Sequence, residues 1–230
     1  MNYGPAAAAS FSRASTNRLT RHDLDRFVGP SLFAALGRAV CEAGCLPRKE
    51  LFEAWEMARR VRRRFRGGRV VDLAGGHGLL AQALLLLDDS SPSALVVDAS
   101  LPPSAARLHD SLIAVWPRLR DRIAFVAADL DAVALADGDL VASCHACGEL
   151  TDRVLDVAMR AHARVAVLPC CHDLRAAPST LEAWMDPALA QDVERVHRLE
   201  RARYNVWTHV IPSDITPKNR LLLAQPADRR

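Results

Sequence analysis

The sequence has few lysines and few aromatic residues, and it contains no long apolar run. No stretch of about 18 or more apolar residues occurs, so we expect no membrane-spanning segment. Of the 30 basic residues only Lys49 and Lys218 are lysines, and the rest are arginines. A net charge of +3 is too small to establish a nucleic-acid partner, although arginine suits the phosphate group well.

A secretory signal is also missing. The first 21 residues are rich in Ala and Ser, contain arginines and have no apolar core, which fits an organelle transit peptide or a frayed N-terminus. We therefore expect a protein of the reducing cytoplasm. In such a compartment the six cysteines are expected as free thiols or metal ligands, not as disulfides.

What the sequence does contain is a regular alternation of β-rich and helical segments. Residues 1–21 are predicted to form a flexible tail, 22–66 an N-terminal helical region and 67–230 one domain. Apolar strands are predicted at 70–73, 94–98, 123–129, 140–143, 164–168, 204–211 and 220–224. Because helices separate the first five, the pattern predicts a doubly wound, mostly parallel α/β sheet, closed by an antiparallel hairpin.

A glycine-rich turn follows the first predicted strand. The run Val70–Leu73 is followed by Ala74, Gly75, Gly76, His77 and Gly78, and a helix begins at Leu79. Glycines allow positive φ and let a ligand approach the backbone N–H groups at the helix start. The third glycine of a dinucleotide fingerprint and the Lys of a P-loop are both missing. Asp72 opposes a pyrophosphate and favours a cationic ligand, such as the amino group of a sulfonium amino acid.

Two carboxylates end the next two predicted strands. Asp98, 20 residues after Gly78, can accept hydrogen bonds from both hydroxyls of a ribose. Asp129 can accept one from an exocyclic adenine amine. The alternative is that both side chains only cap the helices that follow.

The segment from Val70 to Gly78 resembles the first motif of class I S-adenosylmethionine-dependent methyltransferases. The resemblance implies a seven-stranded Rossmann-like sheet in which the fourth and fifth strands neighbour the first. It also implies S-adenosylmethionine as cofactor, with Asp98 on the ribose and Asp129 near the adenine. The residues implied around the methionine part are Gly75, Gly76 and Gly78, and Asp72 and Ala74 are also expected to bind the cofactor.

Cysteine and histidine follow the fourth and fifth predicted strands, in the runs Ser143–Asp152 and Leu168–His172. Together with Ile215–Arg220, these runs resemble one branch of the superfamily, which includes the methyltransferase domain of the glutathione S-transferase C-terminal-domain-containing protein. Acceptor-stem tRNA 2′-O-methyltransferases share a similar His-x-Cys-Gly and Cys-Cys-His arrangement. The resemblance covers about residues 47–225 but lacks the zinc-finger appendages of those tRNA enzymes. No Asn/Asp-Pro-Pro-aromatic sequence follows the fourth strand, which speaks against methylation of an adenine amine.

Three interpretations of this cluster remain open. In the favoured one His145 removes the acceptor's proton and the thiols of Cys144, Cys147, Cys170 and Cys171 shape the pocket, without a metal. In the second, zinc is held by Cys147, Cys170, Cys171 and His172, although neighbouring cysteines would point to opposite sides if the fifth strand continued. In the third, the thiols only pack the strand ends.

Basic residues suggest the acceptor. The run Arg59–Arg66 contains six arginines that an RNA backbone could contact, and RNA is the preferred acceptor, with tRNA and a ribose hydroxyl as candidates within it. Residues expected to bind the substrate are His172, Lys218, Asn219 and Arg220. A small molecule or a protein side chain is the alternative acceptor, and a non-catalytic cofactor-binding module or a zinc-stabilised nucleic-acid-binding protein are the rival functions. The tryptophans are interpreted as packing residues, and no protein partner is indicated.

Overall fold

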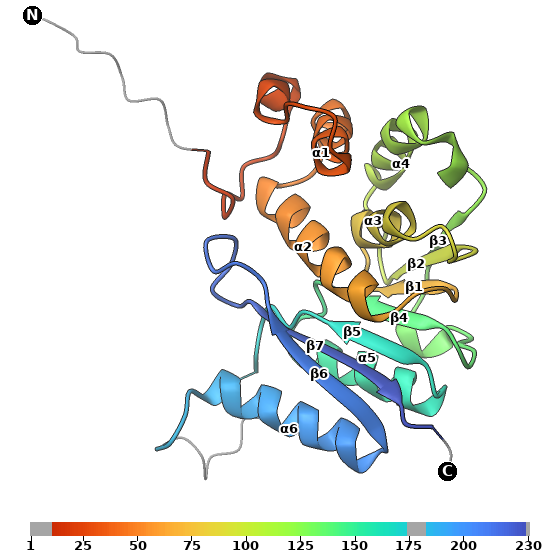
Figure 1. The fold of residues 1–230 in the computed structure, drawn as a ribbon, viewed down its shortest axis with the longest axis vertical. Coiled ribbons are helices and arrows are strands. Elements are labelled where there is room, and N and C mark those ends of the chain that lie inside the picture. The colour runs from red at the N-terminus through yellow and green to blue at the C-terminus, as the bar shows by residue number, and fades with distance from the viewer. Residues whose placement is uncertain (1–10, 174–182, 229–230) are drawn as a thin grey trace, which may run out of the picture.

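The computed structural model describes residues 11–173 and 183–228, and it shows a central sheet between two layers of helices (Figure 1). Seven strands form the sheet in the order β3-β2-β1-β4-β5-β7-β6. Their bounds are β1 Val70–Leu73, β2 Ala94–Asp98, β3 Ile123–Ala127, β4 Leu140–Ser143, β5 Arg164–Val167, β6 Tyr204–Val210 and β7 Arg220–Pro226. The seven strands and the closing antiparallel pair confirm the fold class predicted from the sequence.

Helices cover both faces of the sheet because the central strands are apolar on both sides. Val70 and Val96 belong to the core under one helix layer, and Val71 and Val97 to the core under the other. This alternation explains the near-continuous apolar runs of these strands. The first layer holds α1 Leu32–Ala43, α2 Arg48–Arg64, α3 Leu79–Leu87 and α4 Ala105–Val115, and the second holds α5 Glu149–Arg160 and α6 Pro187–Arg201. Short 3-10 turns are η1 Arg21–Arg26, η2 Pro117–Leu119 and η3 Leu130–Ala132.

The strand order corrects one expectation. The fourth strand lies beside the first, as the resemblance implied, but β5 pairs with β4 and not with β1. Strand β7 then runs antiparallel between β5 and β6. All five parallel strands therefore end on one side, which we call the carboxyl end of the sheet, where ligands bind in open α/β folds.

The N-terminal region differs from the expected tail and separate helical segment. The side chain of Leu19 is buried, and its backbone N–H donates to the Leu46 carbonyl oxygen at 2.9 Å. Residues 11–21 thus pack against the helices, while residues 1–10 lie outside the described part of the chain. Met57 and Val61 of α2 share one core with Leu84 of α3, so the expected boundary at 66/67 divides no separate core.

Among the residues that the structure describes, no helix combines the length and the apolar character needed to cross a bilayer.

Candidate functional site

The glycine turn has the geometry that its sequence predicts. Gly76 and Gly78 both have positive φ, 51° and 72°, as the chain passes from β1 into α3. A Cβ on Gly75 would lie 2.8 Å from Val96 Cγ1, and one on Gly78 would lie 2.9 Å from the Phe125 ring. A Cβ on Gly76 would meet nothing within 4 Å. Gly75 and Gly78 therefore allow close packing on the neighbouring strands, whereas Gly76 presents open backbone to a ligand.

Asp98 stands beside this open backbone at the end of β2. One carboxylate oxygen accepts from the Gly76 N–H at 3.0 Å, and the other accepts from the Ser100 N–H at 3.1 Å. Each carboxylate oxygen can accept a second hydrogen bond. The arrangement leaves Asp98 able to bind a pair of neighbouring hydroxyls at the turn.

Asp72 has a different environment because it lies in the middle of the sheet. Its side chain is buried and accepts a hydrogen bond from the Ala81 N–H at 3.1 Å. Burial raises the pKa of Asp72 to about 7, and the negative charge of Asp98 adds to the effect. Asp72 is thus a carboxyl group that gains strongly from a cation placed next to it.

A small cavity of about 20 Å³ has Asp72 in its wall, together with Cys144 and His145. Burial, together with the charge of Glu53, raises the pKa of Glu50 to about 7, so the cavity has two carboxyl groups in its wall. Sequence reasoning did not find Glu50, which stands in the first turn of α2 and belongs to no motif. The lining residues are Leu46, Glu50, Ala54, Asp72, Ala74, Gly75, His77, Leu79, Leu80, Cys144 and His145.

Asp129 makes contacts within the protein. Its carboxylate caps η3 by accepting from the Asp131 N–H at 2.9 Å, and it pairs with Arg153 at 2.7 Å. These contacts are those of the capping alternative. An adenine amine would have to share an exposed carboxylate that an arginine already holds.

Comparisons with known proteins identify the fold. Residues 50–177, more than half of the chain, match a family model described as a methyltransferase domain. The chain belongs to this methyltransferase family. The enzyme is an S-adenosylmethionine-dependent methyltransferase, and S-adenosylmethionine is its cofactor. No curated protein sequence matches the chain significantly.

Solved structures support the same fold at low sequence identity. The ribosomal protein L11 methylase from Lactobacillus delbrueckii subsp. bulgaricus is 14% identical with a TM-score of 0.52, and the match covers 79% of both chains. The pyocyanin biosynthetic protein PhzM is 20% identical with a TM-score of 0.51, over 90% of this chain and 61% of its own. The B. subtilis tRNA methyltransferase TrmK is 16% identical with a TM-score of 0.51, over 75% and 66%. The present chain therefore covers less than two thirds of the length of PhzM and of TrmK.

The turn fits the cofactor, which supplies a methyl group on a positively charged sulfur. Gly76 leaves room for the ligand, and Asp98 has free acceptor capacity beside it. Two carboxyl groups with raised pKa values, Asp72 and Glu50, suit the cationic ammonium of its methionine part.

His145 and Cys144 follow β4 directly and have different surroundings. Cys144 is buried, and burial raises its pKa well above the usual value, so its thiol is a neutral part of the cavity wall. His145 is exposed on one side. The pKa of His145 is lowered, first by desolvation from the surrounding protein atoms and then by the positive charge of Lys49. The imidazole is therefore neutral at pH 7 and can accept a proton.

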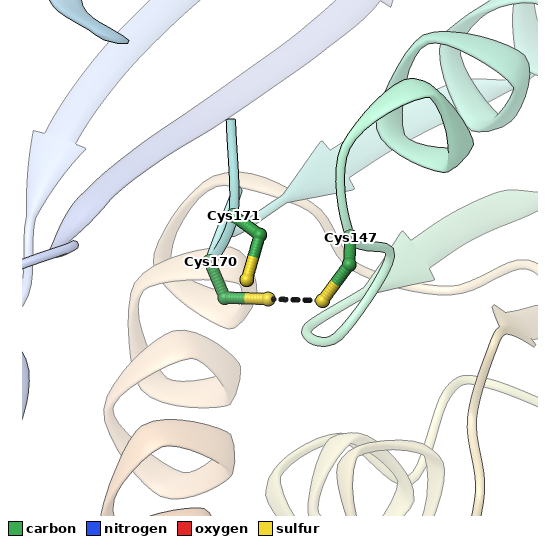
Figure 2. Close-up of side chains that lie close together, drawn as sticks. All are labelled: Cys147, Cys170 and Cys171. Atoms are coloured by element: carbon green, nitrogen blue, oxygen red, sulfur yellow. Dashed lines mark hydrogen bonds between the residues drawn. The ribbon is translucent and has the colours of Figure 1, made fainter. Parts of the chain in front are cut away.

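The other three thiols of the cluster come together beyond β4 and β5 (Figure 2). The sulfurs of Cys147 and Cys170 lie 3.0 Å apart, and all three sulfurs lie within 4.8 Å of one another. Gly148 donates its N–H to the Cys171 carbonyl oxygen at 3.0 Å, which joins the two segments. A hydrogen bond with Cys147 and the charges of Lys218 and Lys49 lower the pKa of Cys171.

Most of the residues predicted to bind the substrate are held by the protein itself. His172 donates to Asp192 at 2.8 Å, and Arg220 donates to the other oxygen of this carboxylate at 2.6 Å. The Asn219 amide donates to the Ile211 carbonyl oxygen at 2.8 Å and closes the turn between β6 and β7. The Lys218 side chain forms no ion pair with the described residues.

The predicted arginine face of α2 is divided among several roles. Arg62 is buried, only 2% exposed, and its guanidinium pairs with Asp88 at 3.1 Å. Arg59 and Arg60 both pair with Glu56. The six arginines are therefore not one solvated patch, because one of them faces the core.

Arg60, Arg63 and Arg64 of this face border a groove of about 930 Å³ along β6 and β7, which we call the arginine groove. The Arg64 guanidinium lies 3.4 Å from the centroid of the Trp207 ring. The groove is lined by Arg60, Arg63, Arg64, Pro169, Leu189, Asp192, Val193, Val196, Trp207, Thr208, His209, Val210, Arg220, Leu221 and Leu222.

Trp184 does not line this groove. It is interpreted from the sequence as a packing residue, but its side chain is 84% exposed.

Proposed function

We propose that this methyltransferase acts on RNA, with tRNA as the favoured substrate and a ribose hydroxyl as the favoured methyl acceptor. One observation carries the proposal: the arginine groove extends from Arg63 and Arg64 near the end of α2 to Pro169, just beyond β5. Pro169 immediately precedes Cys170, at the carboxyl end of the sheet. A strand bound in the groove would thus reach the neighbourhood of His145.

The chemistry of the groove favours a polynucleotide over a small metabolite. Four arginines border it, and Arg63 has no acidic partner among the described residues. The Arg64 guanidinium already stacks on the Trp207 ring, so a base would have to displace it or stack on it, and Val210, which is 61% exposed, adds apolar surface. Guanidinium groups bind phosphates, and aromatic rings stack on unpaired bases.

The proposed roles of the site residues follow from their surroundings. Asp98 binds the ribose of the cofactor, and Asp72 with Glu50 faces its ammonium. Asp129 is proposed near the adenine, where its contact with Arg153 would have to rearrange. His145 takes the proton that the acceptor hydroxyl loses, while Cys144 keeps the wall apolar and excludes water. The finer relationship to the His-x-Cys-Gly and Pro-Cys-Cys branch is part of this proposal.

The proposal is tested by following a labelled methyl group from the cofactor to its acceptor. The enzyme is incubated with methyl-labelled cofactor and fractionated cell extract, and RNA, protein and metabolites are separated. We expect the label in RNA, removable by ribonuclease, in nucleotides whose neighbouring bond resists alkali because the 2′-hydroxyl is blocked. Label confined to protein or metabolites would refute an RNA acceptor.

Binding to total tRNA tests the groove directly. Replacing Arg63→Glu should weaken binding and reduce the slope of log K against log salt by about one unit, as expected for one lost phosphate contact. Arg120→Glu is the matched control, because Arg120 is exposed and lies after η2, away from the groove. Equal loss of affinity in both variants would show general charge attraction and would exclude the groove.

A further inference from the structure

The three sulfurs of Cys147, Cys170 and Cys171 meet although they come from two separate loops. Figure 2 shows the Cys170 and Cys171 side chains turned toward Cys147 from the segment after β5. Cys147 lies in the loop between β4 and α5. The methyl-transfer chemistry proposed above uses His145 and Cys144, so it does not account for this convergence.

One argument from the sequence spoke against these thiols binding the same metal ion, and the structure removes it. Neighbouring residues of a strand point to opposite faces, so Cys170 and Cys171 would diverge if β5 continued through them. Strand β5 ends at Val167, three residues before Cys170. Outside the strand both side chains can turn the same way, as Figure 2 shows.

The spacing of the sulfurs is close to what a metal ion requires. Zinc–sulfur bonds of about 2.3 Å in tetrahedral geometry place two sulfurs roughly 3.8 Å apart. The Cys147 and Cys170 sulfurs are 3.0 Å apart, and no sulfur pair of the three exceeds 4.8 Å. Shifts of about an ångström, within the reach of side-chain rotation, would bring all three to the required distance.

We propose that Cys147, Cys170 and Cys171 form a binding site for a thiophilic divalent cation such as Zn²⁺, with an open fourth position. His172, expected from the sequence as the fourth ligand, instead donates its Nε2 hydrogen to Asp192. Within the described part of the chain, these three residues form the whole group of candidate ligands. A site with three protein ligands leaves one position for water or a substrate atom.

The exposure of the thiols and the chemistry of metal binding both agree with this assignment. Cys147 and Cys171 are exposed, so an ion can enter from solvent without unfolding of the chain. On binding, the three thiols release three protons to solvent and the sulfurs donate electron pairs to the cation. No oxidation or reduction takes place, so the site needs no further reactant.

Metal content tests the proposal independently of methyl transfer. The full chain is kept reduced with a phosphine, loaded with Zn²⁺, passed over a desalting column and analysed for metal. We expect about one equivalent in the wild type and less than about a tenth in Cys147→Ala and Cys171→Ala. Both cysteines are exposed, so neither change removes core packing. Loading with Co²⁺ should give a sulfur-to-metal charge-transfer band in the wild type and none in Cys147→Ala or Cys171→Ala.

Cys41→Ala is the matched control, because Cys41 is a buried thiol inside α1 and far from the cluster in the chain. This variant should retain its equivalent of zinc. Retention of zinc by Cys147→Ala, or a wild type that leaves the column without metal, would overturn the proposal. Failure of the RNA-labelling experiment would leave the metal result unaffected.

Discussion

The carboxylate of Asp98 accepts a hydrogen bond from the backbone N–H of Gly76 at 3.0 Å. This contact joins the end of β2 to the open turn after β1, where we propose that the cofactor's nucleoside binds. We expect Asp98→Ala to weaken cofactor binding by roughly 10- to 100-fold, since a hydrogen bond to a charged group is worth about 1.5–3 kcal/mol. Calorimetric titration with S-adenosylmethionine measures the change. Asp121→Ala, at an exposed carboxyl outside the turn, should bind like the wild type, and equal affinities in all three proteins would refute the site.

The buried carboxyl of Asp72 should make stability depend on pH. Its pKa rises from 3.8 in the unfolded chain to about 7 in the folded one. The folded state thus holds a proton that the unfolded state releases, and the associated stability is complete below pH 3.8 and lost as the pH rises to about 7.

Asp72→Asn keeps the acceptor for the Ala81 N–H but cannot ionise. Measured by denaturant unfolding from about pH 5 to about pH 8, the wild type should lose stability relative to this variant up to about pH 7 and then run parallel to it. Asp121→Asn is the control and should follow the wild type throughout. A constant difference between wild type and Asp72→Asn over the whole range would contradict the prediction.

Arg62 and Arg63 are neighbours in sequence with opposite environments. Arg62 pairs with the buried Asp88 and donates to Ser91 at 2.8 Å, whereas Arg63 is exposed. Arg62→Ala should lower the free energy of unfolding by about 3 kcal/mol, because the buried Asp88 charge loses its nearest guanidinium and keeps only the more distant Arg66, at 3.7 Å. Arg63→Ala should change it by less than about 0.5 kcal/mol. Chemical denaturation compares the two, and similar values would argue against a structural role of Arg62.

His145 should control the rate of methyl transfer and not the binding of the cofactor. A general base contributes about 100-fold or more, so His145→Gln should reduce turnover on RNA by that factor with unchanged calorimetric affinity for the cofactor. Because desolvation and the charge of Lys49 lower the pKa of His145, the wild-type rate should rise with pH and reach its plateau at a lower pH than an ordinary imidazole would give, and the variant should lack this rise. His22→Gln, at an exposed position in η1, should keep the wild-type profile. A rate in His145→Gln equal to that of the wild type would exclude the role.

Local sequence patterns were enough to predict the seven strands and the glycine turn. Apolar runs such as Val70–Val71 predict a strand that is buried on both faces of the sheet. Glycine at 76 and 78 allows the positive φ that the turn needs. The position of Asp98 also followed from sequence, because parallel strands place their carboxyl ends together. These features depend on neighbours along the chain, and the sequence shows such neighbours directly.

Tertiary contacts decided the rest of the site. The sequence could not show that Arg62 turns to the core, that Arg153 holds Asp129, or that His172 binds Asp192, since each partner lies 20 or more residues away. It also could not fix where β5 ends, and that end alone determines whether Cys170 and Cys171 diverge or point together. A side chain's direction depends on the packing around it and on the backbone it leaves, and both are settled only when the distant segments fold against each other.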